Sequence, residues 1–344
     1  MFNRERHNAI LDLLQSFNSD FLLKANCYFG GGTAISLALD EFRESVDIDF
    51  ICSDDEGYRL LRSSTVSDSL GELLNKPVKY LEDVRTNRDK IYTTLESNGI
   101  SVKVEIVREG RIIISGEYNK DLQVPVLSKE DLFAQKLLAN ADRGLDRASM
   151  SRDIIDLAVM IEKWGEIPIA SWDKAVEAYG KTIPDYFAKS ILLIHDEKHL
   201  KKCLTKMAID DSWLDKIPNT LLNSILNLNE RGISFAYSAE ANELLEKLFP
   251  FKFTLTDNKT GSHVGLNTNK DVLKYFEQYD KDNQIAKWLE SGLIETKTQF
   301  HYLDDENPER VASVLNHEFK TDIKVEPVEI SKSEPIEKAE LEIE

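Results

Sequence analysis

The stretch from Tyr28 to Phe50, YFGGGTAISLALDEFRESVDIDF, decides the fold that we expect. In it, three glycines and Thr33 precede an apolar run with helical spacing, and an Arg-x-Ser-x-Asp-x-Asp pattern with strand spacing follows. We expect Phe21 to Phe29 to form a buried strand, the glycines to allow close backbone approach to a ligand, and Thr33 to cap the next helix. The open amide groups at the start of that helix would attract an anion, and phosphate is the anion we expect.

The aspartates at the end of this stretch predict a second kind of site. Period-2 alternation sends Ser45, Asp47 and Asp49 to one face of a strand and the apolar residues between them to the core. Two carboxylates so close together repel each other unless a positive group lies between them. A divalent metal ion is the obvious candidate, and the alternative is a solvated strand face without a ligand.

A third acid follows on a later strand. KIYTTLES and ISVKVEIV flank the dipeptide Asn98-Gly99, which is typical of a tight hairpin turn. In the second of these strands Glu105 lies on the polar face with Ser101 and Lys103. Metal-dependent nucleotidyl transfer requires a glycine turn before a helix, then two aspartates on one strand and a third acid on a later strand. Two Mg²⁺ ions held by the shared carboxylates activate the attacking hydroxyl and stabilise the leaving pyrophosphate.

The pattern becomes helical at Ser128, where Ser-Lys-Glu-Asp resembles a capping box. The helix that follows carries Lys136 and Arg143, seven residues apart and therefore near one face. RDIIDLAVMIEKW starts a further helix with Asp153 and Asp156 in its first turn. Lys136 could also be an ordinary surface lysine, and the two aspartates could merely complement the positive start of their helix.

These motifs together resemble a known family. FGGGTAISLAL with R-x-S-x-D-I-D-F, followed by K-x-x-A and R-D-x-x-D-L, resembles the AbiEii/AbiGii toxin family of nucleotidyltransferases in the DNA polymerase β-like superfamily. The resemblance covers about residues 5 to 165. The positions of the two later motifs are Lys136, Ala139, Arg152, Asp153, Asp156 and Leu157.

The resemblance implies a fold and an activity. It implies an α/β (α+β) chain with a polymerase β-like mixed sheet and flanking helices, then a helical bundle and a small α/β appendage. The implied activity is Mg²⁺-dependent transfer of a nucleoside monophosphate from an NTP to an acceptor hydroxyl, expected on tRNA. The implied biological role is that of a toxin beside a separately encoded antitoxin, in a toxin–antitoxin or phage-defence system.

The resemblance also implies roles for individual residues. Asp47 and Asp49 would bind metal with Glu105 as the third ligand, and Lys136 would complete the catalytic set. The implied nucleotide-binding residues are Gly31, Gly32, Thr33, Arg43, Ser45, Lys136 and Asp153.

Changes of pattern along the chain predict its division into parts. We expect a nucleotidyltransferase domain over residues 1–125 and a helical domain over 126–250 that completes the nucleotide cleft. Residues 251–320 would form a small α/β domain of unknown role, opening with a hairpin from FKFTLT and SHVGLN. The acidic segment 321–344 is low in aromatic residues, and we expect it to be disordered.

The charge of the chain limits the expected partners. A formal net charge of -18 counts mildly against a nucleic-acid partner, so an RNA contact would need a local basic patch. Lys198, Lys201, Lys202 and Lys206 are either a solvated helix face or such a contact. The nearby HDEKH sequence lacks the glutamate that zinc metalloproteases place after their first histidine, so it does not predict a zinc site.

Localisation and two alternative functions complete the expectations. No apolar run approaches the ~20 residues of a membrane span, no signal peptide is evident, and the three cysteines are widely spaced, so we expect a cytoplasmic protein without membrane association. One alternative is a nucleotidyltransferase that acts on a small-molecule or protein hydroxyl. The other is a non-catalytic module that senses nucleotides.

Overall fold

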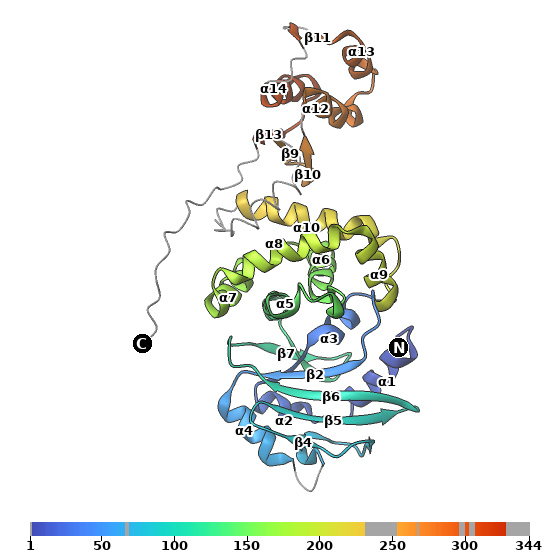
Figure 1. The fold of residues 1–344 in the computed structure, drawn as a ribbon, viewed down its shortest axis with the longest axis vertical. Coiled ribbons are helices and arrows are strands. Elements are labelled where there is room, and N and C mark those ends of the chain that lie inside the picture. Colours follow the sequence, from blue (N-terminus) through green and yellow to red (C-terminus); the bar gives the residue numbers. More distant parts are fainter. Residues whose placement is uncertain are drawn as a thin grey trace. The chain divides into compact units, whose positions relative to one another are not determined.

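The computed structural model describes residues 2–65, 69–230, 253–266, 268–295, 300–302 and 307–327. The chain separates into two compact units, Met1–Phe235 and Ala236–Glu344, and each has its own sheet. Figure 1 shows the helices and strands of both units.

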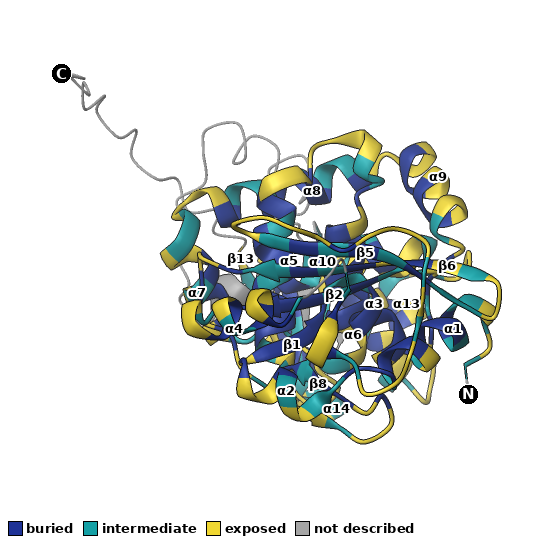
Figure 2. Cartoon of the chain, turned by 90° about the horizontal axis from the view of Figure 1, so that it is seen from below, coloured by how far each residue is buried: buried dark blue, intermediate teal, exposed yellow. Residues whose placement is uncertain are grey.

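A mixed sheet is the centre of the first unit. Its described strands are β1 (Cys27–Gly30), β2 (Asp47–Cys52), β3 (Lys79–Tyr80), β4 (Arg85–Thr86), β5 (Lys90–Ser97), β6 (Ile100–Arg108), β7 (Gly116–Asn119) and β8 (Val124–Leu127). They lie in the order β3-β5-β6-β2-β1-β8-β7, and β4 also pairs with β5. β2 is antiparallel to β1 and parallel to β6, and β1 is parallel to β8. The glycine and aspartate stretch therefore supplies the middle of the sheet, and Figure 2 draws most of β1 and β2 in the dark blue of burial.

The helices of the first unit form an early set and a later bundle. The early set is α1 (Glu5–Leu14), α2 (Ser19–Lys24), α3 (Gly31–Ala38) and α4 (Asp55–Ser64). The bundle is α5 (Lys129–Arg143), α6 (Arg152–Trp164), α7 (Ile169–Tyr179), α8 (Thr182–His195), α9 (Glu197–Met207) and α10 (Trp213–Glu230). In Figure 1 the bundle lies beside the sheet, with α3 between them, where it packs on β1 and β2 and also on α5 and α6.

Local signals set several of these elements as expected. The hydroxyl of Ser128 accepts a hydrogen bond from the amide of Asp131 at 3.1 Å, which confirms the predicted start of α5. Asn98 and Gly99 both have positive φ, 52° and 77°, as a tight hairpin turn between antiparallel strands requires. This hairpin fixes the register of β6 and so the place of Glu105.

The strand expected from Phe21 to Phe29 is wrong in its first half. Residues Ser19–Lys24 form α2, because Asn18 accepts a hydrogen bond from the amide of Phe21 at 3.2 Å and caps a helical turn. Asn26 then takes a positive φ of 48°, and β1 begins only at Cys27. A short apolar run is compatible with either structure, and the cap decided between them.

The second unit has a smaller antiparallel sheet of β9 (Phe253–Asp257), β10 (Ser262–Leu266) and β13 (Ile323–Pro327), in the order β10-β9-β13. The hairpin predicted from FKFTLT and SHVGLN is confirmed as β9 and β10. The remaining elements are β11 (Leu293–Glu295), β12 (Phe300–Tyr302), α12 (Asn269–Phe276), α13 (Gln284–Ser291) and α14 (Pro308–Phe319). Their buried side chains, with Phe276 and Trp288 among the largest, form a separate core.

The start of the acidic segment 321–344 is ordered, which corrects the prediction of disorder for these residues. Ile323 and Val325 are buried in the core of the second unit, while Lys324 between them is exposed. This period-2 alternation places β13 on β9, and the acidic composition of the segment as a whole concealed it. Residues 328–344 lie outside the described part of the chain, as do 231–252.

The division into four domains remains a prediction, since the chain is divided here only into the two units Met1–Phe235 and Ala236–Glu344. In the ranges given above, no helix combines the length and the apolar character that crossing a membrane requires.

Candidate active site

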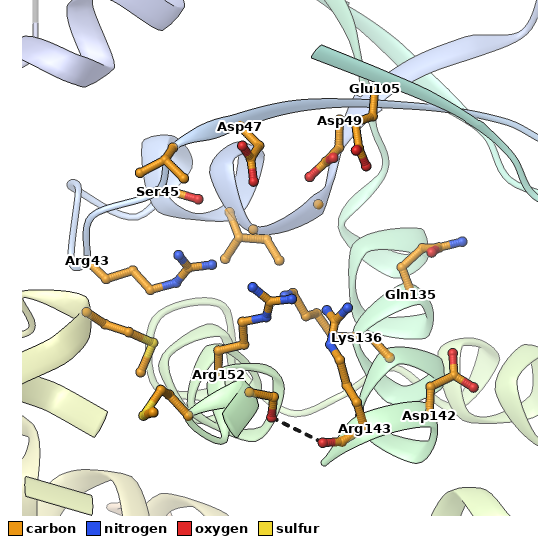
Figure 3. Close-up of a pocket in the computed structure, with 18 of the residues that line it drawn as sticks. Arg43, Ser45, Asp47, Asp49, Glu105, Gln135, Lys136, Asp142, Arg143 and Arg152 are labelled. Carbon is orange, nitrogen blue, oxygen red and sulfur yellow. Dashed lines mark hydrogen bonds between the residues drawn. The ribbon is translucent and has the colours of Figure 1, made fainter. Parts of the chain in front are cut away.

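A cleft of about 860 Å³ opens in the first unit between the polar face of β2 and β6 and the helices α5 and α6. Its volume is within the range of small-molecule and cofactor sites, and Figure 3 shows side chains from the strands facing side chains from the helices across it. Every predicted site residue except Thr33 and Asp153 lines the cleft.

The three predicted acids meet at one wall of this cleft. Asp47 and Asp49 come from β2 and Glu105 from β6, and Asp49 is the register partner of Glu105. Paired positions on neighbouring strands present their side chains on the same face. All three carboxylates point into the cleft in Figure 3. The pairing of β2 with β6 thus brings together the acids that the alternation of the sequence predicted.

Asp47 and Asp49 differ from the other acids of the cleft in their partners and in their pKa. Among the described residues, neither carboxylate takes part in a hydrogen bond or an ion pair with another side chain. Burial, and then the charges of Asp47 and Glu105, raise the pKa of Asp49 to about 6. Burial also raises the pKa of Asp47. The strand face therefore holds negative charge that a cation would stabilise.

Glu105 is in a different state. Lys90 and Lys103 both form ion pairs with its carboxylate. Burial alone would raise the pKa of Glu105, but the hydrogen bonds from Lys103 and Lys90 lower it below its ordinary value. Glu105 is thus ionised and already neutralised, so it is the weaker candidate of the three for a metal.

The chemistry of this set fits a hard divalent cation. Carboxylate oxygens are the ligands that Mg²⁺ prefers, and the ion needs only one or two of them beside substrate phosphates. Within the described part of the chain, no three Asp, Glu, His or Cys side chains already converge as a complete metal site. Asp47 and Asp49 would hold the ion together with the substrate. Glu105 would join them by giving up its ion pair with Lys90 or Lys103.

The glycine turn fits closely around the site. Gly31 has a φ of +68°, and a β-carbon built on it would lie 2.5 Å from Oδ2 of Asp49. A β-carbon on Gly32 would collide with Nη2 of Arg43. At both positions the glycine makes room for a side chain of the site itself, so the turn packs against Asp49 and Arg43.

Thr33 does not cap the helix, contrary to the expectation. α3 begins at Gly31, so Thr33 lies inside its first turn and is buried. Its hydroxyl oxygen lies 2.6 Å from the carbonyl oxygen of Asp47 and 2.8 Å from the hydroxyl oxygen of Ser45. Thr33 and Ser45 therefore tie the start of α3 to the start of β2, next to the first aspartate.

The opposite wall is a buried ionic network on α5 and α6. Nζ of Lys136 lies 2.9 Å from Asp153 and 2.6 Å from Asp156, and Lys136 is only 5% exposed, so it is not a surface lysine. Arg143 also pairs with Asp153, at 2.7 Å, and Arg43 with Asp156, at 2.6 Å. Although burial would raise it, the charges of Lys136 and Arg143 hold the pKa of Asp153 well below its usual range. The network thus joins two cations of α5 and the guanidinium of Arg43 to the two carboxylates of α6.

Some lining residues had no role in the sequence prediction. Arg152 stands in the R-D-x-x-D-L motif, directly before Asp153, and projects into the cleft in Figure 3. Gln135, next to Lys136, donates a hydrogen bond to Glu109 at 2.8 Å. Arg152 could have been found from its motif, whereas Gln135 and Glu109 meet only through the fold.

A mixed sheet with acidic residues, facing helices with lysine and arginine side chains across a cleft, is the arrangement that the sequence predicted for a nucleotidyltransferase. The family model described as "Nucleotidyl transferase AbiEii toxin, Type IV TA system" matches residues 12–255, and the chain belongs to this family. Membership implies a nucleotide substrate and an antitoxin partner.

Solved structures show only weak overall similarity. JHP933 from Helicobacter pylori aligns with a TM-score of 0.41 and 13% identity, over 68% of this chain and 97% of its own. An antigenic nucleotidyltransferase-like protein from Paracoccidioides brasiliensis aligns with a TM-score of 0.35 and 16% identity, over 61% of this chain and 97% of its own. No curated protein sequence matches the chain. The family assignment rests on the family model.

Proposed function

We propose that this enzyme transfers a nucleoside monophosphate from an NTP to an acceptor hydroxyl on RNA, with tRNA as the expected acceptor, and so acts as the toxin of its pair. The observation that carries the proposal is the pair of carboxylates without an ion-pair partner among the described residues, Asp47 and Asp49, opposite Lys136, Arg143 and Arg152 in one cleft. A nucleoside triphosphate has the charge and the size to lie between these walls.

The glycine turn supports the placement of the triphosphate. The amide groups of Gly31 and Gly32 open the first turn of α3, where a helix favours anions. The hydroxyl of Thr33 is engaged by Ser45 and by the backbone of Asp47, so Thr33 would contribute its amide. Nε and Nη2 of Arg43 both donate hydrogen bonds to the carboxylate of Asp156. Because these donors are occupied, Arg43 would orient the glycine turn.

Lys136 is suited to hold the nucleotide from the helical side. An ammonium group has three donors, and Asp153 and Asp156 use two of them. The third is available to a phosphate or ribose oxygen. Asp153 would fix the direction of Lys136 and compensate Arg143 at the same time.

The two walls together support in-line transfer. The acceptor oxygen would bond to the α-phosphorus, the bond to the β-phosphate would break, and pyrophosphate would leave. Asp47, Asp49 and Glu105 would hold Mg²⁺, which when bound lowers the pKa of the attacking hydroxyl and neutralises phosphate charge. The chain's own part is to align the acceptor hydroxyl and the α-phosphate between β2 and α5. Holding the two reacting groups in this geometry lowers the activation barrier of the transfer.

The acceptor is tested by following the label. The purified protein is incubated with Mg²⁺ and each α-³²P-labelled NTP, together with total tRNA, with RNase-treated lysate, or alone. We expect one or more NTPs to label tRNA and to release pyrophosphate. Label in protein or in small molecules would contradict an RNA acceptor. Nucleotide binding without release of pyrophosphate in any arm would favour the sensing module and contradict transfer.

A further inference from the structure

The two ends of the cleft differ in how their cations are paired. At the end near Gln135, Arg111 is held by Glu109 at 2.8 Å and by Asp142 at 2.9 Å. At the other end Arg152 lines the cleft, and its side chain forms no hydrogen bond or ion pair with another described residue. Figure 3 shows Arg152 on the side of Arg43, away from Gln135. A polyanion would therefore be attracted to the Arg152 end.

A line of lysines on α9 leads to this same end. Lys198, Lys202 and Lys206 follow one another at four-residue intervals on one exposed face, ~6 Å apart along the helix axis. In the described chain none of the three has an acid partner, whereas Lys201 beside them pairs with Glu197. Lys206 lines the cleft itself. We call Lys198, Lys202 and Lys206 the α9 stripe.

Apolar side chains accompany the cations where the stripe meets the cleft. Met207 follows Lys206 in the chain, Met150 lies two residues before Arg152, and all line the cleft with Val46, which directly precedes β2. Val46, which the alternation predicted in the core, is 42% exposed. An exposed apolar surface beside free cations is suited to the face of a nucleobase and its phosphate. The other end offers mainly paired ionic groups.

We propose that the α9 stripe binds the phosphate backbone of the acceptor RNA strand and directs its terminal hydroxyl past Arg152 to Asp47. This inference rests on the proposed function, because it gives the path of the acceptor into the same site. The repeated spacing of the stripe is comparable with the separation of successive phosphates in a strand. In a chain of net charge -18, a row of unpaired lysines is not a consequence of general basicity.

Salt-dependent binding tests the stripe. Fluorescently labelled total tRNA is titrated with the full chain between about 50 and 200 mM salt, because each phosphate contact to a single strand contributes about 0.7 to the slope of log K against log salt. The variant K198Q/K202Q/K206Q should reduce the magnitude of that slope by about 2 and weaken binding. The control K24Q/K76Q/K120Q changes the net charge equally at exposed lysines outside the cleft and should keep the wild-type slope. Thermal unfolding of both variants checks that they are folded.

Other outcomes decide separately on the stripe and on the proposed function. A wild-type slope in the stripe variant, or no binding of tRNA by the wild type, would overturn the inference. Loss of antitoxin binding in the stripe variant with an unchanged RNA slope would also overturn it, since the stripe would then be a protein interface. If the stripe variant loses slope but the wild type never labels RNA, the stripe stands as an RNA surface and the RNA acceptor fails.

Discussion

The guanidinium of Arg43 donates two hydrogen bonds to the carboxylate of Asp156, at 2.6 and 2.9 Å, across 113 residues of sequence. Both side chains are almost entirely buried. Arg43 lies between α3 and β2, whereas Asp156 lies on α6 beside Lys136. The pair therefore joins the strand wall of the cleft to its helical wall and fixes their separation.

Breaking this pair should destabilise the first unit strongly. D156A leaves a buried guanidinium without its partner, and we expect the free energy of unfolding to fall by about 3–5 kcal/mol. Urea unfolding measures the change. The control E96A removes the exposed pair of Lys79 and Glu96 and should cost less than about 1 kcal/mol. Similar losses in the two variants would show that the buried pair does not join the walls.

The glycine turn makes a prediction that separates strain from collision. G31A would both strain a positive φ and push a methyl group against Asp49, so we expect transfer to fall by at least about 10²-fold. G99A carries the same kind of strain, at φ +77°, with open space around it. It should cost about 1 kcal/mol of stability and leave the rate of transfer unchanged. Equal loss of transfer in both would contradict the packing of Gly31 on Asp49.

His7 makes stability depend on pH. Its Nδ1 lies 2.8 Å from Glu41, and its Nε2 accepts a hydrogen bond from the amide of Ser45 at 3.2 Å. Burial lowers the pKa of His7 below 6.5, against the opposite effect of Glu41 and Glu44 and with a contribution from Arg4. Below pH 6.5 His7 therefore binds more protons in the unfolded chain than in the folded one. The free energy of unfolding decreases as the pH falls through this range.

Comparison with H7Q isolates this effect. Because glutamine does not titrate, the wild type should lose up to about 1.4 kcal/mol per pH unit more than H7Q as the pH falls below 6.5. Urea unfolding at a series of pH values measures the difference. Parallel curves for the two proteins would mean that His7 is protonated in the folded state as readily as in the unfolded state.

Metal removal should abolish transfer. With EDTA we expect no labelled product, and added Mg²⁺ should restore it, because no side chain of the described residues forms an ion pair with Asp47 or Asp49, and burial raises the pKa of both. E105Q should raise the Mg²⁺ concentration for half-maximal transfer about tenfold. E96Q, on the same hairpin but outside the cleft, serves as the control. Full activity in EDTA would contradict the metal site.

Signals within a few residues were readable from the sequence, and contacts between distant segments were not. The alternation of Asp47 and Asp49 and the turn at Asn98-Gly99 depend on local geometry, so the strand face was predictable. The bonds of Arg43 to Asp156 depend on how α6 packs, which no spacing reveals. For the same reason a buried Lys136 could not be told from a surface lysine.

Two errors came from local signals that compete. The hydroxyl of Thr33 is suited to capping, but α3 starts earlier because Gly31 and Gly32 can adopt the turn, and the hydroxyl bonds to β2 instead. Ile323 to Pro327 alternates like a strand but lies in an acidic segment, and the composition outweighed the alternation. In both cases the tertiary partner settled the outcome.

Replacement of Asp49 by asparagine tests nucleotidyl transfer at this cleft most directly. D49N keeps the shape of the side chain but removes the charge. Because the pKa of Asp49 is raised to about 6, its ionised form costs stability at neutral pH, so D49N should fold at least as well as the wild type. We expect purified, folded D49N to transfer labelled nucleoside monophosphate at least about 10²-fold more slowly than the wild type. Transfer by D49N at the wild-type rate would contradict the assignment.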